Sequence, residues 1–99
     1  MQALAKCQSI ASCLLRVTQL QEQGLMTIGQ IGLAKAYTTQ TGREVVRLCR
    51  EVCGGNGILL ENRVGKAFTD MEGIHTYEGT YQINTLVAGR EFTGASAFR

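Results

Sequence analysis

The hydrophobic and polar positions of this chain repeat with helical spacing over long windows. In the first window apolar side chains recur at steps of three and four residues, at Leu4, Cys7, Ala11 and Leu14. The sequence contains no proline, the residue that most often interrupts a helix. The pattern predicts a helix from about Gln2 to Gln23 that ends at Gly24, a residue suited to a C-terminal cap.

A second predicted helix has the better marked start. Thr27 followed by Gln30 matches a capping box, in which each side chain satisfies a free backbone N–H of the other residue. The helix then carries a stripe at alternating steps of three and four, made of Ile31, Ala34, Thr38, Thr41, Val45, Leu48 and Val52. Such a stripe predicts nearly antiparallel packing of long helices, and its small and hydroxyl members predict close approach. Gly54 and Gly55 end the helix.

The remaining sequence predicts a short helix and a further long one. Val64, Ala67, Phe68 and Met71 fit a short helix between Asn62 and Met71, with Gly73 breaking the pattern. Ile58, Leu59 and Leu60 are predicted to be buried. The last helix is expected from Thr80 or Tyr81 to Gly94. The predicted fold is therefore an all-α antiparallel bundle of three long helices and one short helix, forming one domain over residues 1–99.

Composition excludes several functions. The formal charge is +2 and evenly spread, which argues against a nucleic-acid surface. No run approaches the roughly 20 apolar residues of a membrane span, and the first residues do not resemble a secretory signal. A domain of 99 residues buries proportionally little surface, so we expect apolar faces that need a partner.

The cysteines and the single histidine do not predict a metal site. Cys7, Cys13, Cys49 and Cys53 lack CxxC spacing and a nearby histidine, and Cys49 and Cys53 are awkwardly placed for a disulfide. We expect reduced thiols in an intracellular compartment. His75 has no partner at metal-ligand spacing, which favours a structural role.

Two short stretches carry the chemistry, although each also has a purely structural interpretation. Gly54-Gly55-Asn56-Gly57 is either a helix cap or a loop whose missing side chains let a ligand approach backbone N–H groups. In Thr76-Tyr77-Glu78-Gly79-Thr80, Glu78 either complements the dipole of the last helix or serves as a base.

These two stretches, together with Gly89-Arg90-Glu91 and Thr93-Gly94, resemble the C-terminal domain of the acyl-CoA dehydrogenases. The resemblance runs from about Met26 to the end, and the first helix fits the core helix that precedes this region in the family. Within the family it is nearest to glutaryl-CoA dehydrogenase and the short-chain acyl-CoA oxidases of plant peroxisomes. It implies the last quarter of a longer FAD enzyme that oxidises an acyl-CoA thioester, without the N-terminal helical domain and the β-domain.

The resemblance also implies roles for individual residues. Glu78 matches the base that removes the proton alpha to the thioester, and its backbone N–H, with a flavin ribityl hydroxyl, holds the thioester oxygen. Gly79 matches a substrate contact. FAD contacts are implied for Thr80, Phe98, Gln82, Gly54 and Gly55, with Gln82 matching medium-chain relatives only. Gly54 and Gly55 meet FAD held mainly by the neighbouring subunit, which implies a homo-oligomer, either a dimer or a tetramer. We expect Glu78 to point into a pocket shared with the flavin and the thioester, in the groove beside the double-glycine loop.

Several points stay open at this level. The substrate is an acyl-CoA, with glutaryl-CoA and its decarboxylation as one option, and the electron acceptor is either an electron-transfer flavoprotein or oxygen. We expect a soluble protein of the mitochondrial matrix, a peroxisome or a bacterial cytoplasm. The isolated 99 residues are not expected to bind FAD or turn over. The alternative is a non-catalytic helical fragment or module that binds a full-length relative.

Overall fold

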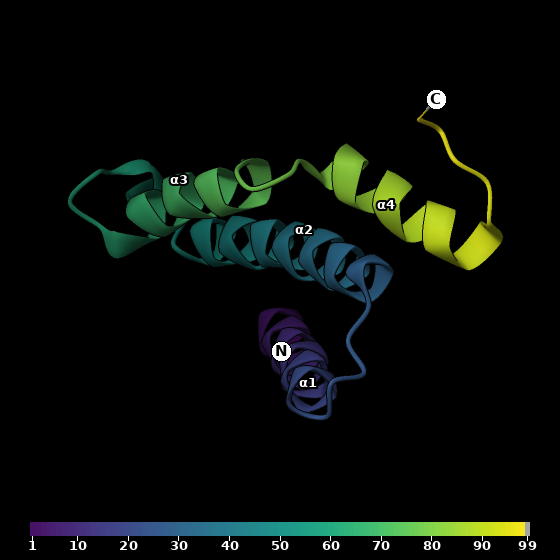
Figure 1. Cartoon of the computed structure of the whole chain (residues 1–99). Coiled ribbons are helices and arrows are strands. Elements are labelled where there is room, and N and C mark those ends of the chain that lie inside the picture. Colours follow the sequence, from purple (N-terminus) through teal and green to yellow (C-terminus); the bar gives the residue numbers. More distant parts are fainter. Residues whose placement is uncertain (99) are drawn as a thin grey trace.

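A computed structural model describes residues 1–98, and these contain helices without any strand. The elements in order are α1 Gln2–Glu22, α2 Ile28–Val52, the 3-10 helix η1 Gly54–Ile58, α3 Arg63–Thr76 and α4 Tyr81–Thr93 (Figure 1). The all-α prediction is confirmed. The predicted lengths need one adjustment, because α3 has 14 residues and α4 has 13, so two long helices accompany two shorter ones of similar length.

Helix α2 is the centre of the molecule, because α1, α3 and α4 each pack against it. Figure 1 shows α3 and α4 following one another along α2, with α1 beside it in another direction. As the chain proceeds through α3 and α4, the residues of α2 that they contact move back toward the start of α2. They proceed from Arg43 with Glu72, through Gly32 with Asn84, to Gly29 with Glu91. The predicted antiparallel packing is confirmed for α2 against α3 and α4.

Glycines of α2 allow this close approach. A Cβ placed on Gly32 would lie 2.8 Å from the backbone oxygen of Asn84, and one on Gly42 would lie 2.7 Å from the sulfur of Met71. Ala34 and Thr41 are buried as the predicted stripe requires. The prediction that the whole stripe is buried is wrong for its first and last residues. Ile31 and Val52 remain 50% and 89% exposed.

The helix starts and stops follow local chemistry. Thr27 accepts a hydrogen bond from the N–H of Gln30, and the Gln30 side chain accepts one from the N–H of Thr27, which completes the predicted capping box. Gly94 adopts a left-handed φ of 74° and caps α4. Both predictions are confirmed.

The third helix is longer than predicted, because it continues through Gly73 to Thr76. A glycine inside a helix costs only about 1 kcal/mol relative to alanine, and contacts to α2 on both sides of Gly73 offset that cost. Before it, Glu72 pairs with Arg43 at 2.7 Å, and after it, His75 bonds to α2. Tertiary packing therefore overrides the local break.

The segment after the double glycine was also predicted incorrectly. Ile58, Leu59 and Leu60 are 68%, 44% and 91% exposed rather than buried. Gly54 to Ile58 form a tight 3-10 turn, and Leu59 and Leu60 continue into a further turn, so their side chains project from the end of the molecule.

Residues 1–98 bury few of their apolar side chains. The buried apolar side chains are the small ones of Ala34, Ala36 and Ala88, whereas large ones such as Leu14 and Phe92 remain exposed. This distribution agrees with the expectation that apolar faces of the domain need a partner surface.

The four cysteines are unpaired. No group of three or more histidine, cysteine or acidic side chains comes together as a possible metal site in residues 1–98. None of the helices in that span combines the length and apolar character that a membrane crossing demands.

Candidate active site

The bend between α3 and α4 presents Glu78 on strained backbone. Glu78 has a φ of 55°, and it is the one residue other than glycine with positive φ in the described part of the chain. A side chain with a Cβ rarely adopts this conformation, which is enriched at functional sites. The carboxylate is exposed. The bend therefore holds an acidic side chain in a conformation that costs energy.

Gly79 follows Glu78 with a φ of 92°. A Cβ at this position would lie 3.1 Å from the side-chain nitrogen of Asn84, so both the backbone and the space favour glycine. Asn84 in turn donates to the carbonyl oxygens of Gly79 at 2.7 Å and of Thr80 at 3.0 Å. This side chain of α4 thus closes the second half of the bend.

Thr80 has a structural role that the sequence did not separate from a ligand contact. Its hydroxyl accepts a hydrogen bond from the N–H of Ile83 at 3.3 Å and caps α4. Gln82 lies exposed in the first turn of the same helix. Glu78, Gly79, Thr80 and Gln82 therefore form one contiguous group at the entrance of α4.

His75 supports the first half of the bend. Its Nδ1 lies 3.0 Å from the hydroxyl of Thr39, and its Nε2 lies 3.4 Å from the guanidinium of Arg43. Its ring stacks on Tyr81 with centres 5.8 Å apart. Burial and the positive charge of Arg43 lower the pKa of His75 below its ordinary value. The lowered pKa favours the neutral ring, and its packing agrees with the predicted structural role.

Lys35 is the residue that sequence reasoning missed at this bend. Its ammonium donates to the carbonyl oxygens of Tyr77 and Gly79, on either side of Glu78. The available signal was a lysine between Ala34 and Ala36, two small apolar residues of the central helix that prove to be buried. A charge at such a position needs a partner, but the sequence does not identify that partner.

The double-glycine loop contains glycines with different roles. Gly54 has a φ of 56°, and a Cβ at Gly57 would lie 2.4 Å from the backbone oxygen of Arg50, so the fold itself demands both. Gly55 has neither property, since its φ is not positive and no atom lies within 4 Å of a Cβ built there. The missing side chain of Gly55 is therefore unexplained by the fold of this chain and leaves room for a ligand to approach.

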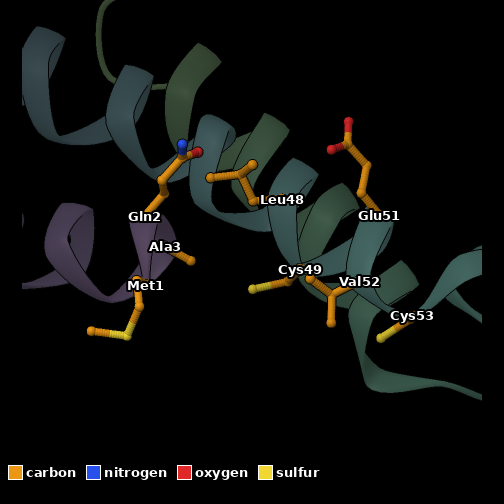
Figure 2. Close-up of a pocket in the computed structure, with 8 residues that line it drawn as sticks. All are labelled: Met1, Gln2, Ala3, Leu48, Cys49, Glu51, Val52 and Cys53. Carbon is orange, nitrogen blue, oxygen red and sulfur yellow. The ribbon is translucent and has the colours of Figure 1, made fainter.

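The groove beside this loop lies at the far end of α2 from Glu78. A cavity of about 660 Å³ separates the start of α1 from the end of α2, with Cys49 and Cys53 along one wall and Met1 along the other (Figure 2). Lys35, which holds the Glu78 bend, and Cys53 are 18 positions apart in the sequence, which corresponds to about 27 Å of helix. The expectation that Glu78 faces the groove beside the loop is wrong for a single chain.

Phe98 marks a third location. It is 48% exposed and lies beside Ile28 and Val87, in a cavity of about 500 Å³ near the start of α2 and the end of α4. The entrance of α4, where Glu78 lies, is the opposite end of that helix. The residues predicted to form one site thus occupy three places along the molecule, which the fold of one chain does not bring together.

Comparisons with known proteins place these residues in context. A family model described as "Acyl-CoA dehydrogenase, C-terminal domain" matches residues 1–92. Two curated proteins of Yarrowia lipolytica are similar over 56 residues, or 57% of this chain: acyl-coenzyme A oxidase 3 at 38% identity and acyl-coenzyme A oxidase 2 at 39%. The match spans 8% of the length of each oxidase.

Two solved structures of Mycobacterium smegmatis proteins are also similar. One is a glutaryl-CoA dehydrogenase with 32% identity and a TM-score of 0.83, covering 88% of this chain and 22% of that protein. The other is a glutaryl-CoA dehydrogenase in complex with FADH2, with 27% identity and a TM-score of 0.79, covering 97% of this chain and 27% of that protein. The chain therefore spans about a quarter of each of these relatives.

Proposed function

Because the chain belongs to the acyl-CoA dehydrogenase family through its C-terminal domain, we propose that it forms the base-bearing part of an FAD-dependent acyl-CoA dehydrogenase. In this proposal Glu78 removes the proton alpha to the thioester carbonyl. The observation that carries the proposal is the positive φ of Glu78 in a bend held by Lys35. Backbone strain of this kind is concentrated at functional sites.

The residues around Glu78 suit this chemistry. The absence of a side chain at Gly79 leaves room for the acyl chain next to the carboxylate. The backbone N–H of Glu78 is available to hold the thioester oxygen as negative charge develops on it. Bound FAD would supply a two-electron acceptor for the hydrogen that leaves the beta carbon. Gly55, with open space above it, and Gly54 would let the backbone of the loop meet the cofactor.

The substrate proposed first is a short acyl-CoA of the glutaryl type, supported by the two similar solved structures. The similarity to acyl-coenzyme A oxidases supports oxygen as an alternative electron acceptor to an electron-transfer flavoprotein. An assay of the complete natural polypeptide against an acyl-CoA panel, with and without oxygen, distinguishes these options. Carbon dioxide release from glutaryl-CoA tests decarboxylation in the same experiment.

The first prediction concerns the base itself. In the complete natural polypeptide, Glu78→Gln should leave the FAD content unchanged and lower kcat by about 10²- to 10⁴-fold, the usual contribution of a general base. Flavin absorbance reports the cofactor, and reduction of an artificial electron acceptor reports turnover.

Glu22→Gln, at the exposed end of α1, provides the matched control and should retain the parent rate. Parent-like turnover by Glu78→Gln would show that another group is the base.

A non-catalytic binding module is the second candidate, favoured by the large exposed apolar side chains such as Leu14 and Phe92. It predicts that the natural polypeptide binds a full-length relative but dehydrogenates no member of the acyl-CoA panel, even with FAD supplied. Turnover that disappears in Glu78→Gln would reject it.

A further inference from the structure

The ammonium group of Lys35 lies inside the bend that presents Glu78. Lys35 belongs to the second turn of α2, and its Nζ donates hydrogen bonds of 2.5 Å to the carbonyl oxygens of both Tyr77 and Gly79. The same atom lies 5.8 Å from the centre of the Tyr77 ring, where a cation is attracted to the aromatic face. One side chain of α2 thus holds the residue before Glu78 and the residue after it.

These hydrogen bonds also fix the direction of two N–H groups. In a planar trans peptide the carbonyl oxygen and the following N–H point in opposite directions, and residues 1–98 contain no cis peptide bond. Since the Tyr77 carbonyl points at Lys35, the N–H of Glu78 points away from it. The Gly79 carbonyl also points at Lys35, so the N–H of Thr80 points away from Lys35 as well. Both donors therefore face outward from α2, and no backbone acceptor in the described chain takes a bond from them.

The conformation of Glu78 makes this support necessary. Rotation of the peptide between Tyr77 and Glu78 would relieve the positive φ of 55°, and it would turn the Glu78 N–H inward. Hydrogen bonds from an ammonium group are about twice as strong as neutral ones, so Lys35 opposes this rotation. Without the ammonium, the relaxed peptide orientation gains population.

We infer that Lys35 is a positioning residue, which orients the Glu78 N–H toward the thioester oxygen by holding the Tyr77 and Gly79 carbonyls. Lys35 touches neither substrate nor cofactor in this role and acts through the backbone. That the Glu78 N–H faces a thioester rests on the proposed function above. The effect of Lys35 on the backbone of the bend does not depend on that function.

The second prediction tests the backbone effect. In the complete natural polypeptide, Lys35→Met keeps an unbranched apolar stem but removes the ammonium. Amide hydrogen exchange should become at least about tenfold faster at Tyr77, Ile83 and Asn84. These amides bond to Gly73, to the Thr80 hydroxyl and to the Thr80 carbonyl respectively, and all three bonds require an ordered bend.

Two further variants serve as controls for this experiment. Lys66→Met removes an exposed lysine that pairs with Asp70 within α3 and should leave all three exchange rates unchanged. Lys35→Arg keeps a cation and should restore most of the protection. Unchanged exchange in Lys35→Met would overturn the inference, whatever the activity of the protein.

Kinetics then test the link to the thioester. For Lys35→Met, kcat should fall about 10- to 100-fold while KM changes by less than about threefold, because the oriented N–H acts mainly on charge that develops during reaction. Faster exchange with parent-like kcat and KM would overturn the link. A parent protein that oxidises no acyl-CoA would instead defeat the proposed function, and the exchange data would still decide the backbone role.

Discussion

The hydrogen-bond partners of His75 favour the neutral form of its ring. Arg43 donates toward Nε2, and the Thr39 hydroxyl already donates to the carbonyl oxygen of Lys35 at 2.8 Å. The Thr39 oxygen is therefore free to accept from Nδ1–H of a neutral ring. A protonated ring would carry its charge next to Arg43 and lose the acceptor that Arg43 uses, which agrees with the lowered pKa.

This protonation state predicts a stability change with pH, which is the third prediction. Because the pKa of His75 is lower in the folded chain than the ordinary 6.5, the unfolded chain binds more protons near that value. The stability contributed by the neutral ring is complete above it and declines as the pH falls through it. The thermal midpoint of the natural polypeptide should drop between about pH 7.5 and about pH 5.5, and His75→Gln should make that drop smaller.

His75 and Glu44 affect stability over different ranges of pH. The hydrogen bond from Lys6 lowers the pKa of Glu44 below 4.5, so its contribution is lost only at more acidic pH. An equal midpoint drop for His75→Gln and the parent would contradict the assignment of a neutral His75.

At the scale of helices, the close approach of the α2 backbone to the α4 backbone depends on the missing side chain of Gly32. This is the fourth prediction. Gly32→Ala would place a Cβ 2.8 Å from a backbone oxygen of α4, and backbone cannot rotate aside as a side chain can. We expect a loss of about 1–3 kcal/mol of stability, seen as a lower thermal midpoint.

Gly73→Ala is the matched control, since it lies inside α3 with no atom within 4 Å of the added Cβ. It should raise stability by about 0.5–1 kcal/mol, because alanine is the better helix former. If both variants shifted the midpoint in the same direction, the close approach of α2 and α4 would not be limiting.

The sequence predicted the elements whose signals are local. The Thr27 capping box and the Gly94 cap depend on neighbouring residues, and both appear as predicted. The end of α3 depends on contacts of Glu72 and His75 with α2, which lie about 30 to 40 positions away in sequence. Local glycine chemistry at Gly73 therefore gave the wrong boundary.

In the candidate site, too, the sequence predicted local features but not the contacts between distant residues. The sequence identified Glu78 and the double-glycine loop, but it did not reveal that Lys35, which holds the Glu78 bend, and Cys53, which precedes the loop, are about 27 Å apart along α2. Lys35 escaped notice because its partners are backbone carbonyls, which leave no trace in side-chain patterns. Positions within a motif are readable from sequence, whereas the register between helices is not.

At the scale of the whole molecule, this separation bears on how a complete site is assembled. The Glu78 bend contacts Lys35 near the start of α2, whereas Gly55 lies just beyond the end of α2, and the proposed FAD would contact both regions. A symmetric pair of chains resolves the difference if the loop of one chain meets the cofactor beside Glu78 of the other. Gly55 suits an experimental test because a side chain there would clash with nothing in its own chain.

The fifth prediction uses two inactive variants of the natural polypeptide, Glu78→Gln and Gly55→Val. Each should be inactive alone, the second because the added side chain blocks the approach of the cofactor. When they are refolded together in equal amounts, half of the pairs are mixed, and one of the two sites in each mixed pair combines an intact Glu78 with an intact Gly55. Activity should therefore return to about one quarter of the parent value. A site built within one chain would give no recovery, because every chain in the mixture carries one of the two defects.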